Sequence, residues 1–502
     1  MINALLNKNK YEYDIHSLIK AFYPETDVKM FVEGEEPYIS SESGLHIDIR
    51  IVMADEEGYV EVSYIKDESE TITKKLKCTK STAENDKASS TNGSSASLQT
   101  PKNALKQALY LVLNKETGKT LPWGTLTGIR PVKIPMTLIE QGKSQDEIKA
   151  YMEDVYFCGE EKTELSIDIA AREHALLKDI DLKKGYSIYI GIPFCPTTCM
   201  YCSFTSFPIA AWKDRVDDYV TCLEKEIDYV ADAFNGRTLD TIYVGGGTPT
   251  TLEPYQIERL LSKIEDKLDL SNLKELTVES GRPDSITPEK LRAMKKHNVT
   301  RISVNPQTMH DKTLKFIGRR HTVEQSVNAY KMAREEGFDN INMDIILGLP
   351  GENLADVEET MRQITFLAPD DLTVHSLAIK RASALQEWIN KNGISMINNT
   401  DDMMRAAANG AEKMELKPYY LYRQKNMSGN FENTGYAKEG KAGLYNIIMM
   451  EEKESVVALG AGSVSKALFD NGRIERCDNI KDITLYMNRI DEMIERKKVL
   501  FS

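Results

Sequence analysis

The 502-residue sequence has no uninterrupted apolar run long enough to span a bilayer. Its first residues, MINALLNKNKYEYDIHSL, lack the cationic start and apolar core of a secretory signal. It also has no excess of positive charge, because the formal net charge is -13. That balance disfavours nonspecific binding to nucleic acid or to an anionic membrane surface, since both need a cationic face. We therefore expect neither a membrane span nor a nucleic-acid partner.

Cysteine is also scarce. Seven cysteines, an odd number with three of them clustered, suit a reducing compartment better than a disulfide framework. Hydrophobic residues make up 41% and charged residues 28% of the chain, which is typical of a soluble globular protein. A chain of this length normally forms two to four domains. The composition predicts a cytoplasmic enzyme of several domains.

The first 180 residues mix strand and helix patterns. Two strand-like stretches occur at 44–53 and 58–65. Residues 81–100 are poor in large apolar residues and rich in Ser, Thr, Asn and Ala, which predicts a flexible surface loop. Helical periodicity follows at 103–118, 136–156 and 162–179. We predict a separate α+β domain over residues 1–180.

From residue 186 short β-branched runs alternate with amphipathic helices. The candidate strands are 186–192, 241–247, 274–280, 301–307, 340–348 and 370–378. Strands that alternate with helices form parallel βαβ units with right-handed crossovers. The pattern therefore predicts an α/β fold, a partial (β/α)6 barrel over residues 181–400. Residues 401–502 are expected to form a further, partly helical domain.

Six polar or glycine-rich segments each follow a predicted strand directly. They are FCPTTCMYC, GGGTPT, ESGRPD, NPQT, GLPGE and LAIKR. In a barrel of parallel strands the active site lies at the carboxyl ends of the strands. We therefore expect these six segments to face one mouth.

Three cysteines, Cys195, Cys199 and Cys202, occur within eight positions of the segment GIPFCPTTCMYCSFTS. Thiolates are soft ligands that select zinc, copper(I) or iron–sulfur clusters. A structural zinc site normally has four ligands, and neither a second cysteine pair nor a nearby histidine completes this set. A cubane held by three thiolates leaves one iron open to a substrate or cofactor. An isolated cysteine is more often a small buried hydrophobe, but three at this spacing predict an iron–sulfur cluster.

Other residues at the predicted mouth have two interpretations each. The glycines of GGGTP, residues 245–249, can let the backbone approach a ligand or can form a tight turn. Glu279 can accept two hydrogen bonds from a ribose diol, or be a surface carboxylate near a turn. Arg319 can pair with a carboxylate in bidentate fashion, or belong to a solvated charge cluster with Arg320 and His321.

Taken together, these motifs resemble a known family. C-x3-C-x2-C with an aromatic residue, Tyr201, before the last cysteine is the signature of radical S-adenosylmethionine (SAM) enzymes. Residues 186–465 resemble the oxygen-independent coproporphyrinogen III oxidase family almost throughout. The matching segments include YVGGGTPT, SVNPQT, NMDIILGLPGE and ALGAGSVS. The segment LPWGTLTGIRPVKI in the first domain resembles a longer subgroup, the HemZ-type coproporphyrinogen dehydrogenases.

The resemblance implies a [4Fe–4S] cluster on the three cysteines and one or two molecules of SAM. In that superfamily the methionyl amine and carboxylate chelate the fourth iron, and one-electron reduction gives a 5′-deoxyadenosyl radical. By resemblance, the cofactor-binding residues are Tyr189, Tyr201, Gly246, Gly247, Thr248, Glu279, Gln307, Arg319, Asp344, Ala378 and Val464. Among these, Tyr189 and the two glycines would contact the first SAM and Glu279 its ribose. Those from Gln307 to Ala378 would contact a second SAM or the substrate region, and Val464 the adenine.

The implied activity is the oxidative decarboxylation of two propionates of coproporphyrinogen III to vinyl groups, giving protoporphyrinogen IX in anaerobic haem biosynthesis. The radical takes a hydrogen from the β-carbon of a propionate, and loss of CO₂ and one electron leaves the vinyl group. The electron donor would be a protein such as flavodoxin or ferredoxin. No catalytic residue is assigned. Lys380 and Arg381 can pair with the substrate carboxylates, although ordinary surface charges are at least as common at such positions.

Two alternatives stay open. The oxidases carry a further cysteine two residues after the third, where this chain has Phe204, as do relatives that act as haem chaperones. Those chaperones usually carry a His-Asn pair followed by an aromatic residue, whereas the corresponding segment GKAGLYNIIMM has no histidine. His375 can be an axial haem ligand or, more commonly for a strand histidine, a hydrogen-bonded core residue. The alternatives are therefore a haem-binding chaperone and a radical SAM enzyme that acts on another tetrapyrrole.

Overall fold

The chain divides into two compact units. The computed structural model describes residues 1–24, 26–35, 47–67, 69–80, 100–128, 130–202, 204, 206–379, 383–393, 396–423 and 431–502. One unit holds residues 1–171 and Arg423, and the other holds residues 172–422 and 431–502. Of the predicted flexible loop at 81–100, only Thr100 lies within the described residues. The three-part domain division stays a prediction.

The first unit is an α+β structure built on a five-stranded sheet. Its strands are β1 (Ile2–Leu6), β2 (Val28–Val32), β3 (Ile47–Ala54), β4 (Tyr59–Lys66) and β5 (Ser69–Lys77), in the order β2-β1-β3-β4-β5. β1 is parallel to β2 and β3, whereas β3, β4 and β5 are antiparallel. Alternate residues of β3 are buried against two helices, α1 (Glu12–Phe22) and α3 (Pro101–Thr117). The strands predicted at 44–53 and 58–65 are confirmed as β3 and β4, except for residues 44–46, which lie outside the described residues.

Three further helices follow α3 along the chain: α4 (Lys133–Glu140), α5 (Gln145–Tyr156) and α6 (Glu160–Leu177). The helical pattern predicted at 136–156 is confirmed, but it forms two helices, because the chain breaks between α4 and α5. Gly142 has φ +75° there, and Ser144 caps α5 in a reciprocal capping box with Glu147. Among the residues that the structure describes, no helix combines the length and the apolar character needed to cross a membrane.

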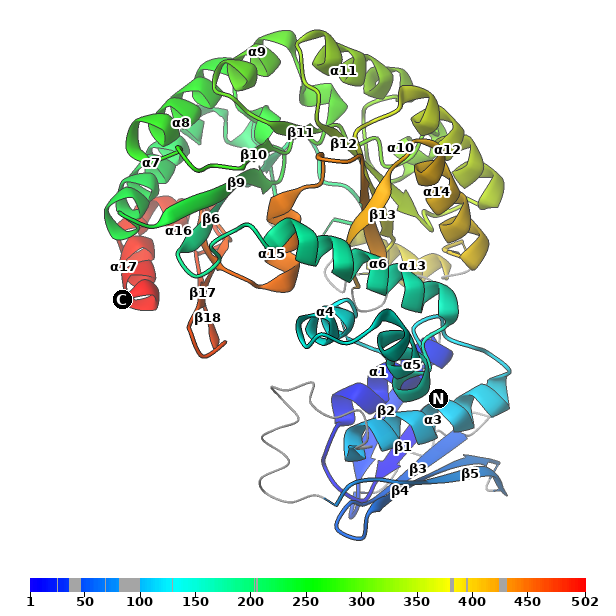
Figure 1. Cartoon of the computed structure of the whole chain (residues 1–502). Helices are drawn as coiled ribbons and strands as arrows, with labels where there is room; N and C mark the ends of the chain where they lie inside the picture. The colour runs from blue at the N-terminus through cyan, green and yellow to red at the C-terminus, as the bar shows by residue number, and fades with distance from the viewer. Residues whose placement is uncertain are drawn as a thin grey trace. The chain divides into compact units, whose positions relative to one another are not determined.

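The second unit contains the predicted partial barrel. Its six parallel strands are β6 (Gly185–Ile192), β9 (Thr238–Gly246), β10 (Glu275–Val278), β11 (Arg301–Ser303), β12 (Ile341–Leu347) and β13 (Asp371–Ser376). The connecting helices are α7 (Val216–Ala233), α8 (Pro254–Lys267), α9 (Pro288–Lys296), α10 (Asp311–Phe316), α11 (Val323–Glu335) and α12 (Leu354–Leu367). Of these helices, α7, α8, α9, α11 and α12 lie along the outer side of the strands (Figure 1). The predicted α/β class and all six predicted strands are confirmed.

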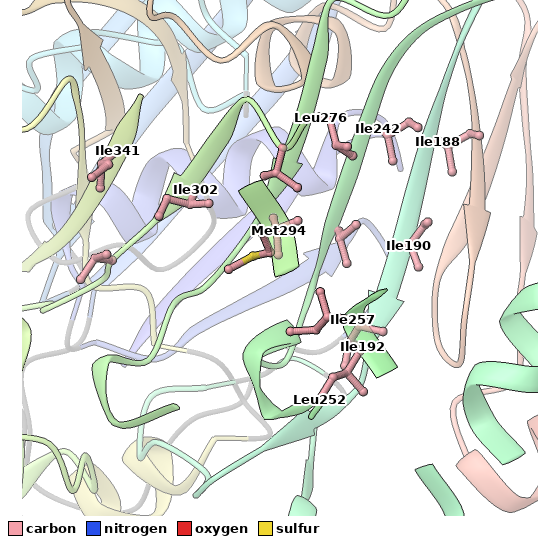
Figure 2. Close-up of a cluster of buried hydrophobic side chains, with 14 of the residues drawn as sticks. Ile188, Ile190, Ile192, Ile242, Leu252, Ile257, Leu276, Met294, Ile302 and Ile341 are labelled. Atoms are coloured by element: carbon pink, nitrogen blue, oxygen red, sulfur yellow. The ribbon is translucent and has the colours of Figure 1, made fainter. Parts of the chain in front are cut away.

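Side chains on alternate positions of these strands have different chemistry. Ile188, Ile190 and Ile192 of β6 are completely buried in the main apolar core. Figure 2 shows them beside apolar residues of neighbouring strands and helices, including Ile242 and Met294. The intervening positions are largely polar or aromatic, namely Tyr189, Tyr243, Thr277, Arg301, Asn342, Asp344, Thr373 and His375. The outer side of the barrel therefore provides the apolar core, and the inner side carries groups that can bind a polar ligand.

Elements from the last hundred residues continue the barrel sheet on both sides. β14 (Lys417–Tyr422) and β15 (Asn433–Ala437) are antiparallel additions next to β13. β16 (Ser455–Leu459) runs parallel to β6 and is followed by β17 (Val464–Leu468) and β18 (Ile474–Asp478). Helix α13 (Ala384–Asn392) precedes this part, whose own helices are α14 (Asp401–Lys413), α15 (Leu444–Glu451), α16 (Ile483–Asn488) and α17 (Ile490–Phe501).

Helix α15 occupies the end of the barrel at which the strands begin. The amide of Leu444 donates a 2.6 Å hydrogen bond to Glu275, the first residue of β10. Tyr445 stacks on Tyr243 of β9, with 4.7 Å between ring centroids. Beside this contact, Arg301 and Asp371 form a buried ion pair of 2.7 Å, and Tyr419 donates to the same carboxylate. Protein therefore fills the end of the barrel opposite the carboxyl ends of the strands.

A buried polar network attaches the C-terminal helices to α7. Lys497 lies 2.7 Å from Glu226, and both side chains have at most 1% of their surface exposed. The carboxylate of Glu226 also accepts hydrogen bonds from Asn479, Tyr486 and the amide of Gly460. A buried charge pair is stable only when its hydrogen bonds are satisfied in this way.

Lys497→Ala should lower the free energy of unfolding by about 3–5 kcal/mol, because it leaves the Glu226 carboxylate buried without its countercharge. Denaturant titration of the wild type and the variant measures this loss. Lys498→Ala is the matched control, since the neighbouring lysine forms an exposed ion pair with Glu495. That control should change stability by less than about 1 kcal/mol. Equal stability of the two variants would contradict the role of the buried pair.

Candidate functional site

The three clustered cysteines lie on a loop that follows β6. β7 (Phe194–Cys195) pairs in parallel with β8 (Phe207–Pro208), which holds the two ends of the loop together. Cys199 and Cys202 are joined by a turn in which the amide of Cys202 donates to the carbonyl of Cys199 at 3.1 Å. All three thiols are partly buried and free of disulfides. Burial raises the pKa of Cys195, and negative charge on the other two thiols raises it further, so the three thiols share one electrostatic environment.

The segment GGGT after β9 is built against the first cysteine. The amides of Gly247 and Thr248 donate 2.7 Å hydrogen bonds to the carbonyls of Ile192 and Phe194. Gly246 has φ +111°, and a Cβ on Gly247 would lie 2.6 Å from the Phe194 carbonyl and 3.0 Å from Cys195 Sγ. A side chain at Gly247 would therefore push the cysteine loop away. The tight turn and the close backbone approach are two aspects of one structure.

The residues at this loop fit an iron–sulfur cluster in their chemistry. Three thiols form a soft donor set, and the glycines leave the backbone beside Cys195 uncovered by side chains. Within the described ranges, no group of three or more His, Cys, Asp or Glu side chains is placed so that it could hold a metal ion. The assignment of Cys195, Cys199 and Cys202 as cluster ligands stays a prediction.

Glu279 lies one residue beyond β10, next to the glycine segment. Its carboxyl group accepts a hydrogen bond from the amide of Gly246. Burial, and secondly the negative charge of Asp344, raise the pKa of Glu279 to about 8. A partly buried carboxyl group with a raised pKa gains from a ligand that donates hydrogen bonds to it, since such bonds favour the ionised form. The arrangement therefore suits a diol.

Gln307 and Asp344 are joined through the backbone. The amide of Gln307 donates to the carbonyl of Asp344 at 2.9 Å, and Gln307 has φ +70°, a conformation rare outside glycine. Its buried Oε1 has no hydrogen-bond partner. A buried amide oxygen normally has one, so it is available to a ligand donor.

The carboxylate of Asp344 lies between Asn342 and His375. Asn342 donates to it at 2.7 Å, and His375 Nε2 lies 3.7 Å from its second oxygen. Burial alone would favour the neutral acid, but His375 and Asn342 together hold the pKa of Asp344 below its ordinary value. Asp344 is therefore a fixed negative charge, in contrast to Glu279.

Arg319 is buried and attached to the cysteine loop. Its Nε lies 3.3 Å from the hydroxyl of Tyr201, and its Nη1 donates to the carbonyl of Asn305 at 2.7 Å. Arg320 next to it is exposed, whereas His321 is buried and its Nδ1 lies 3.9 Å from the carboxylate of Asp284. The solvated charge cluster considered for these three residues is therefore wrong for Arg319 and His321.

Two tyrosines of a stack inside the barrel, Tyr243 and Tyr445, were not predicted from the sequence. Tyr189 stacks on Tyr243 with ring centroids 6.2 Å apart, and Tyr243 stacks on Tyr445. Tyr243 also approaches Glu279, because a Cβ on Gly245 between them would contact both side chains. Tyr243 shares the inward strand positions of Tyr189, which is the signal that could have identified it. Tyr445 belongs to a distant helix, so no local pattern indicates it.

The remaining predicted residues differ in how close they lie to the cysteine loop and the inner side of the barrel. Thr248 Oγ1 lies 3.5 Å from Cys195 Sγ. Val464 follows Ser463, whose Cβ lies beside Gly191 near the end of β6, and Ala378 is partly buried beyond β13. Phe204 is 75% exposed. Lys380 and Arg381 lie outside the described residues.

Comparison with known proteins assigns this arrangement to a class. The radical SAM superfamily profile matches residues 189–364, from β6 to α12, so the barrel with its three-cysteine loop is a radical SAM domain. The superfamily implies a [4Fe–4S] cluster and SAM.

Similarity over most of the chain then identifies the family. The chain is 38% identical over 401 residues to the oxygen-independent coproporphyrinogen-III oxidase-like protein HemZ of Bacillus subtilis, covering 79% of this chain and 80% of that protein. The chain belongs to this HemZ-type family of oxygen-independent coproporphyrinogen III oxidase-like proteins.

Other relatives match a smaller share of this chain. The heme chaperone HemW of Bacillus subtilis is 30% identical over 281 residues, which cover 55% of this chain and 70% of that protein. HemW of Escherichia coli is 28% identical over 292 residues, covering 58% and 72%. The solved structure of coproporphyrinogen III oxidase (HemN) from Escherichia coli has a TM-score of 0.50 at 20% identity, covering 64% of this chain and 73% of that chain. The last similarity is one of fold.

Cys199→Ala should abolish the broad visible absorbance of the anaerobically reconstituted protein and leave it folded, because the apolar core lies on the other side of the strands. Absorption spectroscopy and circular dichroism measure the two properties. Cys477→Ala is the control, since Cys477 is a free, partly buried cysteine on β18 and should keep the absorbance. A Cys199→Ala protein with full iron content would contradict the ligand assignment.

Proposed function

We propose that this protein is a radical SAM oxidoreductase of anaerobic haem biosynthesis, which converts two propionates of coproporphyrinogen III to vinyl groups and yields protoporphyrinogen IX. The observation that carries the proposal is the three-thiol loop at the mouth of a barrel whose inner side is polar and whose other end is filled by α15. Membership of the HemZ-type family supports this choice of substrate.

Cys195, Cys199 and Cys202 would hold the cluster, and its fourth iron would be open to SAM. When bound, the reduced cluster and SAM supply a carbon radical that removes a hydrogen atom from the β-carbon of a substrate propionate. The backbone at Gly246 and Gly247 is free of side chains and would contact the methionyl group. Glu279 would accept hydrogen bonds from the ribose hydroxyls.

The protein must also keep water and its own side chains away from reactive species. Tyr445 and the ion pair of Arg301 with Asp371 occupy the end of the barrel at which the strands begin. These residues therefore separate the site from solvent at that end. The fixed charge of Asp344 and the unpartnered Oε1 of Gln307 would orient a second polar ligand, either another SAM or the substrate. Pairing of the substrate carboxylates with Lys380 and Arg381 stays a prediction, as does a flavodoxin or ferredoxin as electron donor.

Haem carriage is the second candidate. Similarity to HemW and the presence of Phe204 in place of a fourth cysteine favour it. His375 is a poor axial ligand, however, because its Nε2 is directed at Asp344, 3.7 Å away. A third candidate is a radical SAM reaction on a different tetrapyrrole, which the polar inner side of the barrel would also permit.

Anaerobic incubation of the reconstituted protein with coproporphyrinogen III, SAM and a reductant tests the proposal. We expect harderoporphyrinogen, then protoporphyrinogen, with a matching amount of 5′-deoxyadenosine, as detected by chromatography and mass spectrometry. Cleavage of SAM without vinyl products would indicate another substrate. Stoichiometric haem binding with neither product would favour carriage.

Glu279→Ala should weaken SAM binding at least tenfold without loss of cluster absorbance, because a hydrogen bond to a charged group contributes about 1.5–3 kcal/mol. Equilibrium binding by calorimetry measures the affinity. Glu258→Ala is the control, since that carboxylate forms an ion pair with Lys296 on the outer helices. Unchanged affinity in Glu279→Ala would exclude the ribose role.

The same carboxyl group predicts a pH dependence. With a pKa of about 8 in the free protein, Glu279 is mostly protonated at neutral pH, and binding of a diol favours its ionised form. The affinity for SAM should therefore fall as the pH drops below about 8, by up to about tenfold per pH unit. Glu279→Gln should bind more weakly and lose this dependence.

A further inference from the structure

Arg282, in the segment ESGRPD after β10, has no part in the function proposed above, yet it contacts the cysteine loop. Its side chain is 4% exposed. Nη1 donates to Thr197 Oγ1 at 3.1 Å, to the Thr197 carbonyl at 3.4 Å and to Cys199 Sγ at 3.7 Å. One guanidinium nitrogen thus binds both the backbone and the central thiol of the loop.

Asp284 fixes the direction of this guanidinium. Arg282 Nε and Nη2 donate to the two carboxylate oxygens of Asp284 at 3.0 and 2.9 Å. This bidentate pairing leaves Nη1 directed at the loop. The turn is itself fixed, because Ser285 Oγ donates to the Arg282 carbonyl at 2.8 Å and Lys290 donates to the Ser285 carbonyl at 3.2 Å.

The contact places a permanent positive charge beside a thiol in a poorly solvated site. A guanidinium stays charged at all physiological pH values. The charge of Arg282 also acts on Cys195, so its field extends over the loop. Charges interact more strongly in such surroundings than in water. A group bound by these thiols becomes more negative by one charge on reduction, and the nearby cation stabilises that reduced state.

We infer that Arg282, oriented by Asp284, is a positioning residue that orders the cysteine loop and raises the reduction potential of the cluster bound there. The inference rests on the proposed function, because it requires a cluster on Cys199. Hydrogen bonds to the sulfurs and the net charge around a cluster are two of the properties that set its potential. The transferred electron comes from the external reductant, and Arg282 neither gains nor loses a proton.

Two substitutions separate this electrostatic role from a structural one. Arg282→Gln removes the positive charge and should lower the potential. Asp284→Asn removes the compensating negative charge and should raise the potential. If the two residues only maintained the fold, the reduction potentials of both variants would shift in the same direction or not at all. Arg282→Lys restores the charge without the bidentate pairing and should recover most of the wild-type potential.

The experiment is an anaerobic redox titration of the reconstituted full-length proteins, followed by electron paramagnetic resonance of the reduced cluster. In Arg282→Gln the ratio of reduced to oxidised cluster at a fixed potential should fall about tenfold, which corresponds to about 59 mV for a one-electron couple. Arg292→Ala is the control, since Arg292 on α9 is exposed and pairs with Glu336.

The outcomes are distinct. Wild-type potentials in both Arg282→Gln and Asp284→Asn, with full iron content, would overturn the inference. If Arg282→Gln takes up no cluster, the reduction potential of Asp284→Asn decides. A potential that is lower than in the wild type, or unchanged, overturns the inference. A wild-type protein that binds no cluster would instead overturn the proposed function.

Discussion

The structure depends on the alternation of side chains along six parallel strands. Positions such as Ile188 and Ile190 face the helices and form the apolar core, whereas Tyr189, Asp344 and His375 take the intervening positions and face inward. The same strands therefore provide both the stability of the barrel and the polar inner side of the site. A polar interior cannot pack as a closed apolar barrel would, so other parts of the chain must fill one end. Helix α15, with Tyr445 stacked on Tyr243, has this role.

The cysteine loop is ordered by its neighbours rather than by its own structure. Gly247 and Thr248 hold its first residues, Arg282 contacts its centre from the segment after β10, and Arg319 contacts it from the connection between α10 and α11. Four barrel segments thus meet at the thiols, which is the consequence of placing every strand-to-helix connection at the same end of a parallel barrel. The two carboxyl groups near the loop differ in protonation. Asp344 is held ionised, whereas Glu279 has a raised pKa, so a bound hydrogen-bond donor can change its protonation state.

Local patterns predicted the elements well where one segment contained the whole signal. The strands at 186–192 and 340–348 were recognisable because β-branched residues and flanking turns lie within the same few positions. The break between α4 and α5 was not predicted, because the helical periodicity of the sequence continues across Gly142. In the structure Gly142 has positive φ, and the capping box of Ser144 and Glu147 begins a new helix. The strand expected at 301–307 ends at Ser303, and Gln307, which has positive φ, keeps only an isolated bridge to Ile345 of β12.

By itself, the sequence determined the βαβ repeat, the spacing of the three cysteines and the family, because each is encoded in consecutive or regularly spaced residues. Only the tertiary structure decided that Arg282 binds the Cys199 loop, that Arg301 pairs with Asp371, and that α15 fills the barrel. These partners are separated by tens to hundreds of positions, and no local periodicity relates them. Their proximity comes from the folding of the open sheet into a partial barrel, which brings distant strands around one axis.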